Sequence, residues 1–198
     1  MSFGGQVLRR TSGLLGLAAF LLAACGSNPP DDEPDPDPPF TQLAKISASN
    51  AQDWDKFGWS VDLDDGQLLA GTNIVQSPYF PEGKAYLFSR NSGGTDAWGE
   101  VKSFAASDGL DMDLFGYSVS VDGDTALVGA RWEDNNGSDT GAAHLFARDA
   151  GGAGAWGEQK RLVASDGPLS YRFGNALSLD GDIALVGAPG SSVAASYA

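Results

Sequence analysis

The chain has 198 residues, of which 12 are lysine or arginine and 26 are aspartate or glutamate, which gives a formal net charge of −14. This excess of acid argues strongly against nucleic acid as a partner, because phosphate binding requires clustered basic side chains. The chain has one cysteine and one histidine, so an intramolecular disulfide and a metal site built on several cysteines or histidines are excluded.

The first 24 residues are predicted to be a targeting signal rather than part of the fold. Arg9 and Arg10 form a basic start, and a short apolar core follows from Gly13 to Leu22. This core is too short to span a bilayer comfortably, and no stop-transfer pattern follows it. We therefore expect the protein to be exported from the cytoplasm.

The residues around the single cysteine indicate how the exported chain is held. The sequence Leu22-Ala23-Ala24-Cys25 resembles the lipobox of bacterial lipoproteins. The resemblance implies that Cys25 is lipidated, becomes the first residue of the mature chain and anchors the protein to a membrane. An aspartate in the next position implies retention in the inner membrane, so Gly26 favours the outer membrane or the cell surface. The alternative is an ordinary secretory signal that is cleaved near Ala24, with an incidental cysteine.

A tether of residues 25–40 is predicted to follow the signal. Residues 26–40 contain six prolines and five acidic residues. Such a composition cannot bury an apolar core, and proline-rich segments favour extended, polyproline-like conformations. We expect this tether to hold the rest of the chain away from the membrane.

From about residue 44 onward the sequence repeats with a period of 58 residues, and the repeated positions stay in register. These positions are Phe57-Gly58, Phe115-Gly116 and Phe173-Gly174, followed by Gly71, Gly129 and Gly187. A fixed period of this length indicates stacked copies of one supersecondary unit. We expect the repeated phenylalanine to fill space between units and the repeated glycines to allow close backbone approach.

The second copy shows what one unit is. Its alternating and apolar runs predict four strands, over residues 118–121, 125–130, 141–148 and 156–164. Asp122-Gly123 between the first two strands predicts a type I′ turn, in which both central residues have positive φ. The third strand is apolar on both faces, so its sheet must be covered on both faces. A ring of such sheets, each stacked on the next, is a β-propeller.

The repeated pattern resembles the FG-GAP repeats that build the β-propeller of integrin α subunits and many bacterial surface proteins. The resemblance is carried by the three Phe-Gly pairs, the run from Ser118 to Asp124 and the run from Leu185 to Pro189. The second copy has Arg131 and the first has Asn73 where the third has its proline. The resemblance covers about residues 44–190 and implies an all-β fold of four-stranded antiparallel blades.

The period also sets the expected unit boundaries. We expect a first blade over residues 41–103, a second over 104–163 and a partial third over 164–198. Residues 43–47 align with the fourth strand of a preceding blade, and residues 193–198 are a candidate third strand of the last one. About two and a half blades make an incomplete ring, since propellers need at least about four. We expect a truncated array or partial sequence, or self-association through the open blade edges.

No cofactor is predicted. Many members of the family carry a calcium loop of the form Asp-x-Asp-x-Asp-Gly in the first hairpin of a blade. Here that hairpin is a tight turn, Asp122-Gly123-Asp124 or Asp180-Gly181-Asp182, with too few oxygen ligands for calcium. The run from Asp62 to Gly66 comes closest but lacks the spacing of the third ligand. Calcium therefore remains a candidate with an incomplete motif.

Ligand binding is expected on one face of the propeller, where loops between strands two and three lie beside loops that join successive blades. This is the face on which integrin-like propellers bind ligands. The candidate residues on it are Asp108, Asp111, Asp113, Trp132, Glu133, Asp134 and Asp139. Acidic groups with exposed aromatics suit a protein with a basic patch, a cation or a carbohydrate. The alternative is a set of solvated acidic loops whose aromatics pack locally.

Catalysis finds little support in the sequence. His144 falls within the third strand, at the position that Tyr86 holds in the first copy, so both are expected to fill packing positions. A histidine-dependent triad is therefore not expected, and no phosphate-binding loop or nucleophile elbow is present. We expect a non-enzymatic surface module for binding or adhesion. The alternative is the propeller platform of a secreted hydrolase or of a substrate-sensing protein, since a pair of carboxylates can act on sugars.

Overall fold

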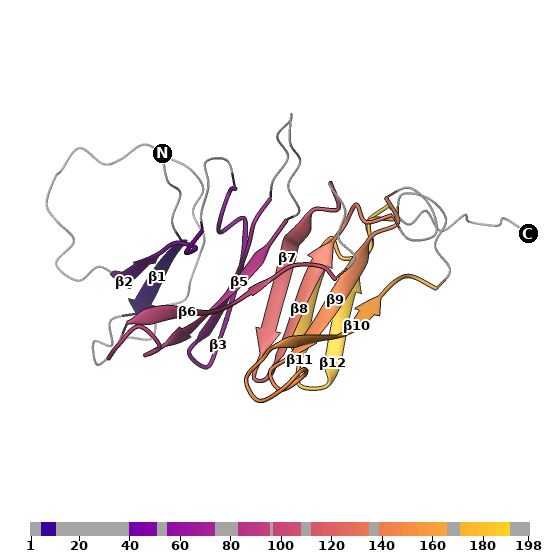
Figure 1. The fold of residues 1–198 in the computed structure, drawn as a ribbon. Helices are drawn as coiled ribbons and strands as arrows, with labels where there is room; N and C mark the ends of the chain where they lie inside the picture. Colours follow the sequence, from indigo (N-terminus) through magenta and orange to yellow (C-terminus); the bar gives the residue numbers. More distant parts are fainter. Residues whose placement is uncertain are drawn as a thin grey trace, which may run out of the picture. The chain divides into compact units, whose positions relative to one another are not determined.

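The computed structural model describes residues 5–10, 40–50, 55–73, 83–95, 97–107, 112–134, 139–165 and 171–190. All regular elements in these ranges are β-strands (Figure 1), and the ranges contain no helix long and apolar enough to cross a membrane. The chain divides into two compact units, one of Gln6–Lys45 and a larger one that includes Ile46–Ala198. The all-β fold class is therefore confirmed.

The smaller unit contains all but one end residue of each strand in a two-stranded sheet, β1 (Gly5–Arg10) and β2 (Phe40–Ile46). A strand close to residues 43–47 was expected, but as the outer strand of a preceding blade. Its partner is instead β1, from the segment predicted to be a signal. An edge strand has unsatisfied N–H and C=O groups and pairs with an extended segment that is within reach. The signal itself stays a prediction, and Cys25 and nearly all of the tether lie outside the described residues.

The first four-stranded sheet is an antiparallel meander of β3 to β6. Its strands are β3 (Ser60–Asp64), β4 (Gln67–Gly71), β5 (Ala85–Arg90) and β6 (Trp98–Phe104). Asp64 pairs with Gln67, so Asp65 and Gly66 form a two-residue turn with φ of 33° and 77°. Two positive φ values fit a type I′ turn, which suits the right-handed twist of the strands.

The second sheet repeats the meander with β7 (Phe115–Asp122), β8 (Thr125–Ala130), β9 (Ala142–Ala147) and β10 (Gly157–Leu162). All four predicted strands are present, and β8 has the predicted ends. The turn type differs from the expectation, because Asp122 pairs with Thr125 and the central residues are therefore Gly123 and Asp124. Gly123 has a φ of 53°, and Asp124 does not have a positive φ. This pattern fits type II′, in which glycine takes the first central position.

The third sheet, as far as the structure describes it, is a hairpin of β11 (Ala176–Asp180) and β12 (Ile183–Gly187). The candidate third strand over residues 193–198 lies outside the described residues. The described sheets do not close into a ring, as expected for part of a propeller.

A single apolar core joins the first two sheets. β7 packs against β3 and β4, and β11 packs in the same way against β7 and β8. The first sheet contributes Leu69, Leu87 and Phe104 to this core, and the second contributes residues that include Val119 and Phe146. The rings of Phe104 and Phe146 lie 4.6 Å apart across the boundary between the sheets. Stacked sheets therefore cover each other's faces, as the two-sided apolar third strand predicted.

The repeated glycines lie where one sheet meets the next. A Cβ atom on Gly71 would lie 2.0 Å from the carbonyl oxygen of Gly116, and one on Gly129 would lie 2.1 Å from that of Gly174. Gly116 and Gly174 have φ of 87° and 85°, which favours glycine. The expectation of close backbone approach at the repeated glycines is confirmed.

The repeated phenylalanines mainly pack within their own units. Phe57 contacts the rings of Tyr86 and Phe88 at 5.7 and 5.9 Å, and Phe115 makes the equivalent contacts in the second sheet. Phe57 and Phe115 are buried, whereas Phe173 is half-buried. The expectation that this residue fills space between units is thus too simple.

Candidate ligand-binding face

The structure divides the predicted ligand residues into three groups. Asp108 and Asp111 lie outside the described residues. Asp113 and Glu133 are buried, so they do not offer their carboxylates to a ligand at the surface. Trp132 and Asp139 are half-buried and Asp134 is exposed. Whether a ligand binds on this face stays a prediction, but the surface available to it is smaller than the sequence indicated.

Backbone hydrogen bonds hold the loop between β8 and β9 against the sheet. The amide of Trp132 donates to the carbonyl of Asp113 at 3.2 Å, and the amide of Gly141 donates to the carbonyl of Glu133 at 3.0 Å. The amide of Asp139 donates to Oδ1 of Asp134 at 2.7 Å. Asp134 therefore stabilises the loop locally, since its carboxylate caps a backbone amide five residues further on.

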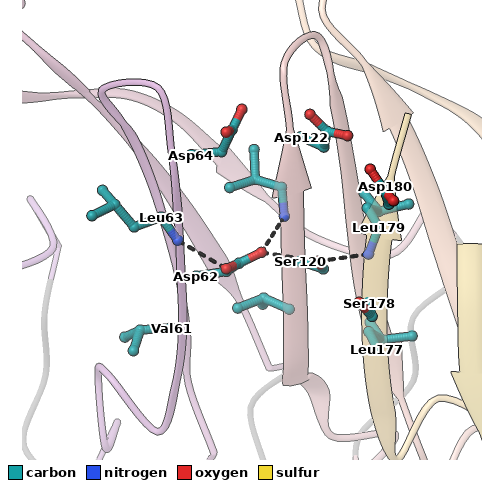
Figure 2. Close-up of a pocket in the computed structure, with 12 residues that line it drawn as sticks. Val61, Asp62, Leu63, Asp64, Ser120, Asp122, Leu177, Ser178, Leu179 and Asp180 are labelled. Carbon is teal, nitrogen blue, oxygen red and sulfur yellow. Dashed lines mark hydrogen bonds between the residues drawn. The ribbon is translucent and has the colours of Figure 1, made fainter. Parts of the chain in front are cut away.

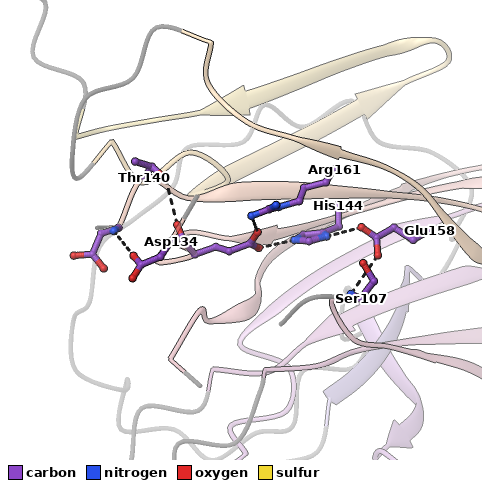
Figure 3. Close-up of polar contacts among 8 residues, drawn as sticks. Ser107, Asp134, Thr140, His144, Glu158 and Arg161 are labelled. Carbon is purple, nitrogen blue, oxygen red and sulfur yellow. Dashed lines mark hydrogen bonds and ion pairs between the residues drawn. The ribbon is translucent and has the colours of Figure 1, made fainter. Parts of the chain in front are cut away.

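Glu133 is buried and binds His144, the only histidine, which Figure 3 shows next to Glu158 and Arg161. His144 is fully buried in β9, and its Nε2 lies 2.6 Å from Oε2 of Glu133. Its Nδ1 lies 2.8 Å from Oε1 of Glu158, on the neighbouring strand β10. Arg161, also on β10, forms an ion pair with the other oxygen of Glu133. A neutral histidine donates from one nitrogen only, so two carboxylate partners favour the doubly protonated, charged ring.

The surroundings of His144 act on its pKa in two directions. Burial alone lowers the pKa, but the hydrogen bonds and charges of Glu133 and then of Glu158 outweigh it, so the pKa is raised. Burial raises the pKa of Glu158, yet its bonds to His144 and Ser107 and the charge of His144 lower it overall. The expectation that His144 fills a packing position is met, because it is fully buried, but its role there is ionic.

Glu158 also links the second sheet to the segment that follows the first. The amide of Ser107, just after β6, donates to Oε2 of Glu158 at 3.3 Å. One period earlier, the amide of Ser49 donates to Oε2 of Glu100 at 2.8 Å. Sequence reasoning missed this contact. The signal for it was the 58-residue spacing of both the serines and the glutamates.

A row of aromatic and cationic side chains lies beside the same loop. It consists of Lys56, Trp59, Tyr117, Arg131 and Trp132. The guanidinium of Arg131 lies 3.8 Å from the ring centroid of Tyr117 and 5.1 Å from that of Trp132. The rings of Trp59 and Tyr117 are 5.8 Å apart, and Lys56 Nζ lies 5.7 Å from the ring of Trp59.

This cation–aromatic row presents positive charge on an acidic chain. Trp59 is exposed, and the other two rings are half-buried. Burial and the charge of Arg172 lower the pKa of Arg131, against the opposing effect of Tyr117. Sequence reasoning had selected only Trp132 from this row. Trp59 and Tyr117 both directly follow a repeated Phe-Gly pair, and this shared position was the sequence signal for these two rings.

A polar cleft of about 420 Å³ lies along the first strands of the three sheets (Figure 2). In it, Oδ2 of Asp62 accepts hydrogen bonds from Ser120 Oγ and from the amide of Val121, both at 2.8 Å. Ser120 Oγ in turn accepts the amide of Leu179 at 3.1 Å. These hydrogen bonds join neighbouring sheets, so the polar residues of the cleft have a structural role. We refer to this line of hydrogen bonds between the first strands as the polar seam.

Two further carboxylates extend this seam at the hairpins. Asp64 Oδ2 accepts the amide of Gly123 at 2.8 Å, and Asp122 Oδ2 accepts the amide of Gly181 at 2.5 Å. Within the described ranges, no group of three or more histidine, cysteine, aspartate or glutamate side chains is arranged to hold a metal ion. The question of calcium at the hairpins stays open as a prediction.

The chain matches the model of a known protein family. The model described as "FG-GAP repeat" matches three segments, residues 40–88, 98–146 and 156–197. These segments follow one another at the 58-residue period and together cover well over half of the chain. No curated protein matches the chain.

Proposed function

Because the chain belongs to the FG-GAP repeat family, we propose that it is a non-enzymatic binding or adhesion module, held outside the cytoplasm by a lipid on Cys25. Membership of the family supports the module, since its repeats generally serve as structural and binding units. The anchor is supported by the sequence Leu22-Ala23-Ala24-Cys25 after a short apolar core. The proline-rich residues 26–40 suit a spacer between that anchor and the sheets.

The cation–aromatic row carries the proposal for the ligand. Exposed rings stack on the apolar faces of sugars, and a guanidinium or ammonium group binds carboxylates. Lys56 and Arg131 provide these cations next to Trp59, Tyr117 and Trp132. We therefore favour an acidic carbohydrate over a basic protein or a free cation, because among the described acidic candidates Asp113 and Glu133 are buried and only Asp134 is exposed.

Binding to immobilised polygalacturonate, with neutral dextran as the comparison, tests this proposal. Trp59→Ala should weaken retention on the acidic polymer by roughly tenfold, since one stacked ring beside a cation is worth about 1–2 kcal/mol. Trp98→Ala is the matched control, because Trp98 begins β6 outside the row. Equal retention of wild type and Trp59→Ala, or preference for dextran, would count against the acidic carbohydrate.

No observation favours the hydrolase alternative. His144 is fully buried and bound to Glu133 and Glu158, so it is not accessible as a general base. The aspartates of the cleft accept backbone amides across the sheet boundaries. A structural role accounts for these groups without a reaction.

A further inference from the structure

The face of β3 that points away from the second sheet exposes apolar side chains. Val61 and Leu63 are 61% and 56% exposed. The residues one period later on β7 are Val119 and Val121, and they are 7% and 3% exposed. Val119 and Val121 are covered because β7 packs against β3 and β4 of the preceding sheet. We refer to Val61, Leu63 and the backbone around them as the leading face.

The third sheet also exposes an apolar side chain, on the face that points away from the second sheet. Leu185 on β12 is 70% exposed, whereas Leu69 and Leu127, its counterparts in the first and second sheets, are 0% exposed. Leu69 belongs to the core that the first sheet shares with the second. Leu185 and Gly187 thus mark a trailing face, with the same pattern of residues that the first sheet uses to hold the second.

We propose that the trailing face of one copy of the chain packs on the leading face of a second copy, so that copies assemble head to tail. The chain itself contains this contact twice, between the first and second sheets and between the second and the third. The period of 58 residues places the same types of side chain at the free faces and in the two internal contacts. A second copy therefore covers Leu185 with Val61 and Leu63, as Val119 and Val121 cover the counterpart of Leu185 inside the chain.

The polar seam predicts the hydrogen bonds of this assembly. Ser120 Oγ accepts the amide of Leu179, so Ser178, one period after Ser120, accepts the amide of Leu63 from the second copy. That amide now donates to Oδ1 of its own Asp62 at 2.9 Å and must exchange partners.

The hairpin carboxylates give a second pair by the same register. Asp64 and Asp122 accept the amides of Gly123 and Gly181, so Asp180 accepts the amide of Asp65 from the second copy. Each predicted bond thus has two equivalents inside the chain, in which the side chain of one sheet accepts a backbone amide of the next.

The geometry of the assembly follows from the two faces being different. A head-to-tail contact between unlike surfaces is heterologous, so copies form a closed ring if the rotation between them closes and an open filament if it does not. The formal charge of −14 per copy opposes association. Added salt screens this repulsion, and we therefore expect assembly to strengthen with ionic strength.

Sedimentation velocity of the full chain in a mild detergent tests the proposal, with wild type expected to form concentration-dependent oligomers. Leu185→Lys places a charge on the trailing face, and Val61→Lys places one on the leading face. Each substitution should weaken association at least about tenfold, because it replaces an apolar contact. Val101→Lys is the matched control, since Val101 is also an exposed valine but lies on β6. Because the mutated side chains are exposed, the circular dichroism spectra should match that of wild type.

A mixture of the two variants gives the most specific result. Leu185→Lys keeps a sound leading face and Val61→Lys keeps a sound trailing face, so an equal mixture should form dimers that cannot grow. Gly187→Ala should also block assembly, because its counterparts Gly71 and Gly129 leave no room for a Cβ atom against the next sheet. A wild type that stays monomeric at all salt concentrations overturns the proposal. The proposal is also overturned if Leu185→Lys, Val61→Lys and Gly187→Ala form oligomers as well as wild type does. Association through the N-terminal segment would give that result.

Discussion

The close contact at Gly129 allows a sharp prediction about stability. In Gly129→Ala, the new Cβ atom would lie 2.1 Å from the carbonyl oxygen of Gly174 and 2.3 Å from Ser118 Oγ. Carbon and oxygen need about 1 Å more than this, so the second and third sheets must move apart or rotate. The hydrogen bond from Ser118 Oγ to the same carbonyl, 2.6 Å long, is lost or distorted.

The expected cost is the sum of these two effects. Overpacking of a closely packed contact costs about 1–3 kcal/mol, and loss of one hydrogen bond costs about 0.5–1.5 kcal/mol. We therefore expect Gly129→Ala to lower the free energy of unfolding by roughly 2–4 kcal/mol. This is a large share of the stability of a small domain, which is about 5–15 kcal/mol.

Gly187→Ala provides the matched control within the same chain. Gly187 is one period after Gly129, but its nearest neighbour for a new Cβ atom is the Cβ of Ala176 at 3.3 Å. A small shift of the exposed backbone at Ala176 is enough, so the free energy of unfolding should change by less than about 1 kcal/mol. Urea unfolding followed by tryptophan fluorescence, at protein concentrations where the chain is monomeric, measures both changes. Equal effects of the two substitutions would refute the close approach of the sheets.

Three further predictions concern single side chains. The raised pKa of His144 contributes stability that is complete below the ordinary histidine pKa of about 6.5 and is lost as pH rises through the raised value. The urea midpoint of wild type should therefore fall over this range, and that of His144→Gln should fall less. Burial first, and then the charges of Asp55 and Glu100, raise the pKa of Tyr86 to about 12. Wild type should therefore lose stability between pH 10 and 12, and Tyr86→Phe should remove that part of the loss. Cys25→Ser should move the protein from the membrane fraction to the soluble fraction and abolish labelling by a radioactive fatty acid; retention and labelling of the variant would contradict lipidation.

The period of the sequence predicted most of the fold because it reports packing that recurs in every unit. Gly71 and Gly129 were recognised as sites of close approach, and the structure places them against the carbonyls of Gly116 and Gly174. The four strands of the second sheet follow from alternation and turn residues, which are local signals. The turn at Gly123 was assigned one residue too early, because pairing between strands and not the Asp-Gly dipeptide sets the central positions.

The candidate site was harder to predict because it depends on differences between the units. Glu133 belongs to an acidic loop, and nothing in that loop indicates that its side chain turns inward to His144 and Arg161. Its partners come from β9 and β10, more than ten residues further along the chain. The pairing of Arg131 with Tyr117 likewise joins residues from different strands of the sheet. Such contacts require knowledge of the strand register before they can be inferred.

The hydrogen bonds across the sheet boundaries have a consequence for the order in which the array forms and opens. Those along the first strands join residues about one period apart, for example Ser60 to Gly116 and Ser118 to Gly174. Folding then couples nearest neighbours only, as in a one-dimensional chain of cooperative units. Amide exchange should be slowest in β8, which has a sheet on either side, and fastest in β12. The described sheets are thus expected to open first at the β11–β12 hairpin. The second sheet, which packs against both of the others, is expected to open last.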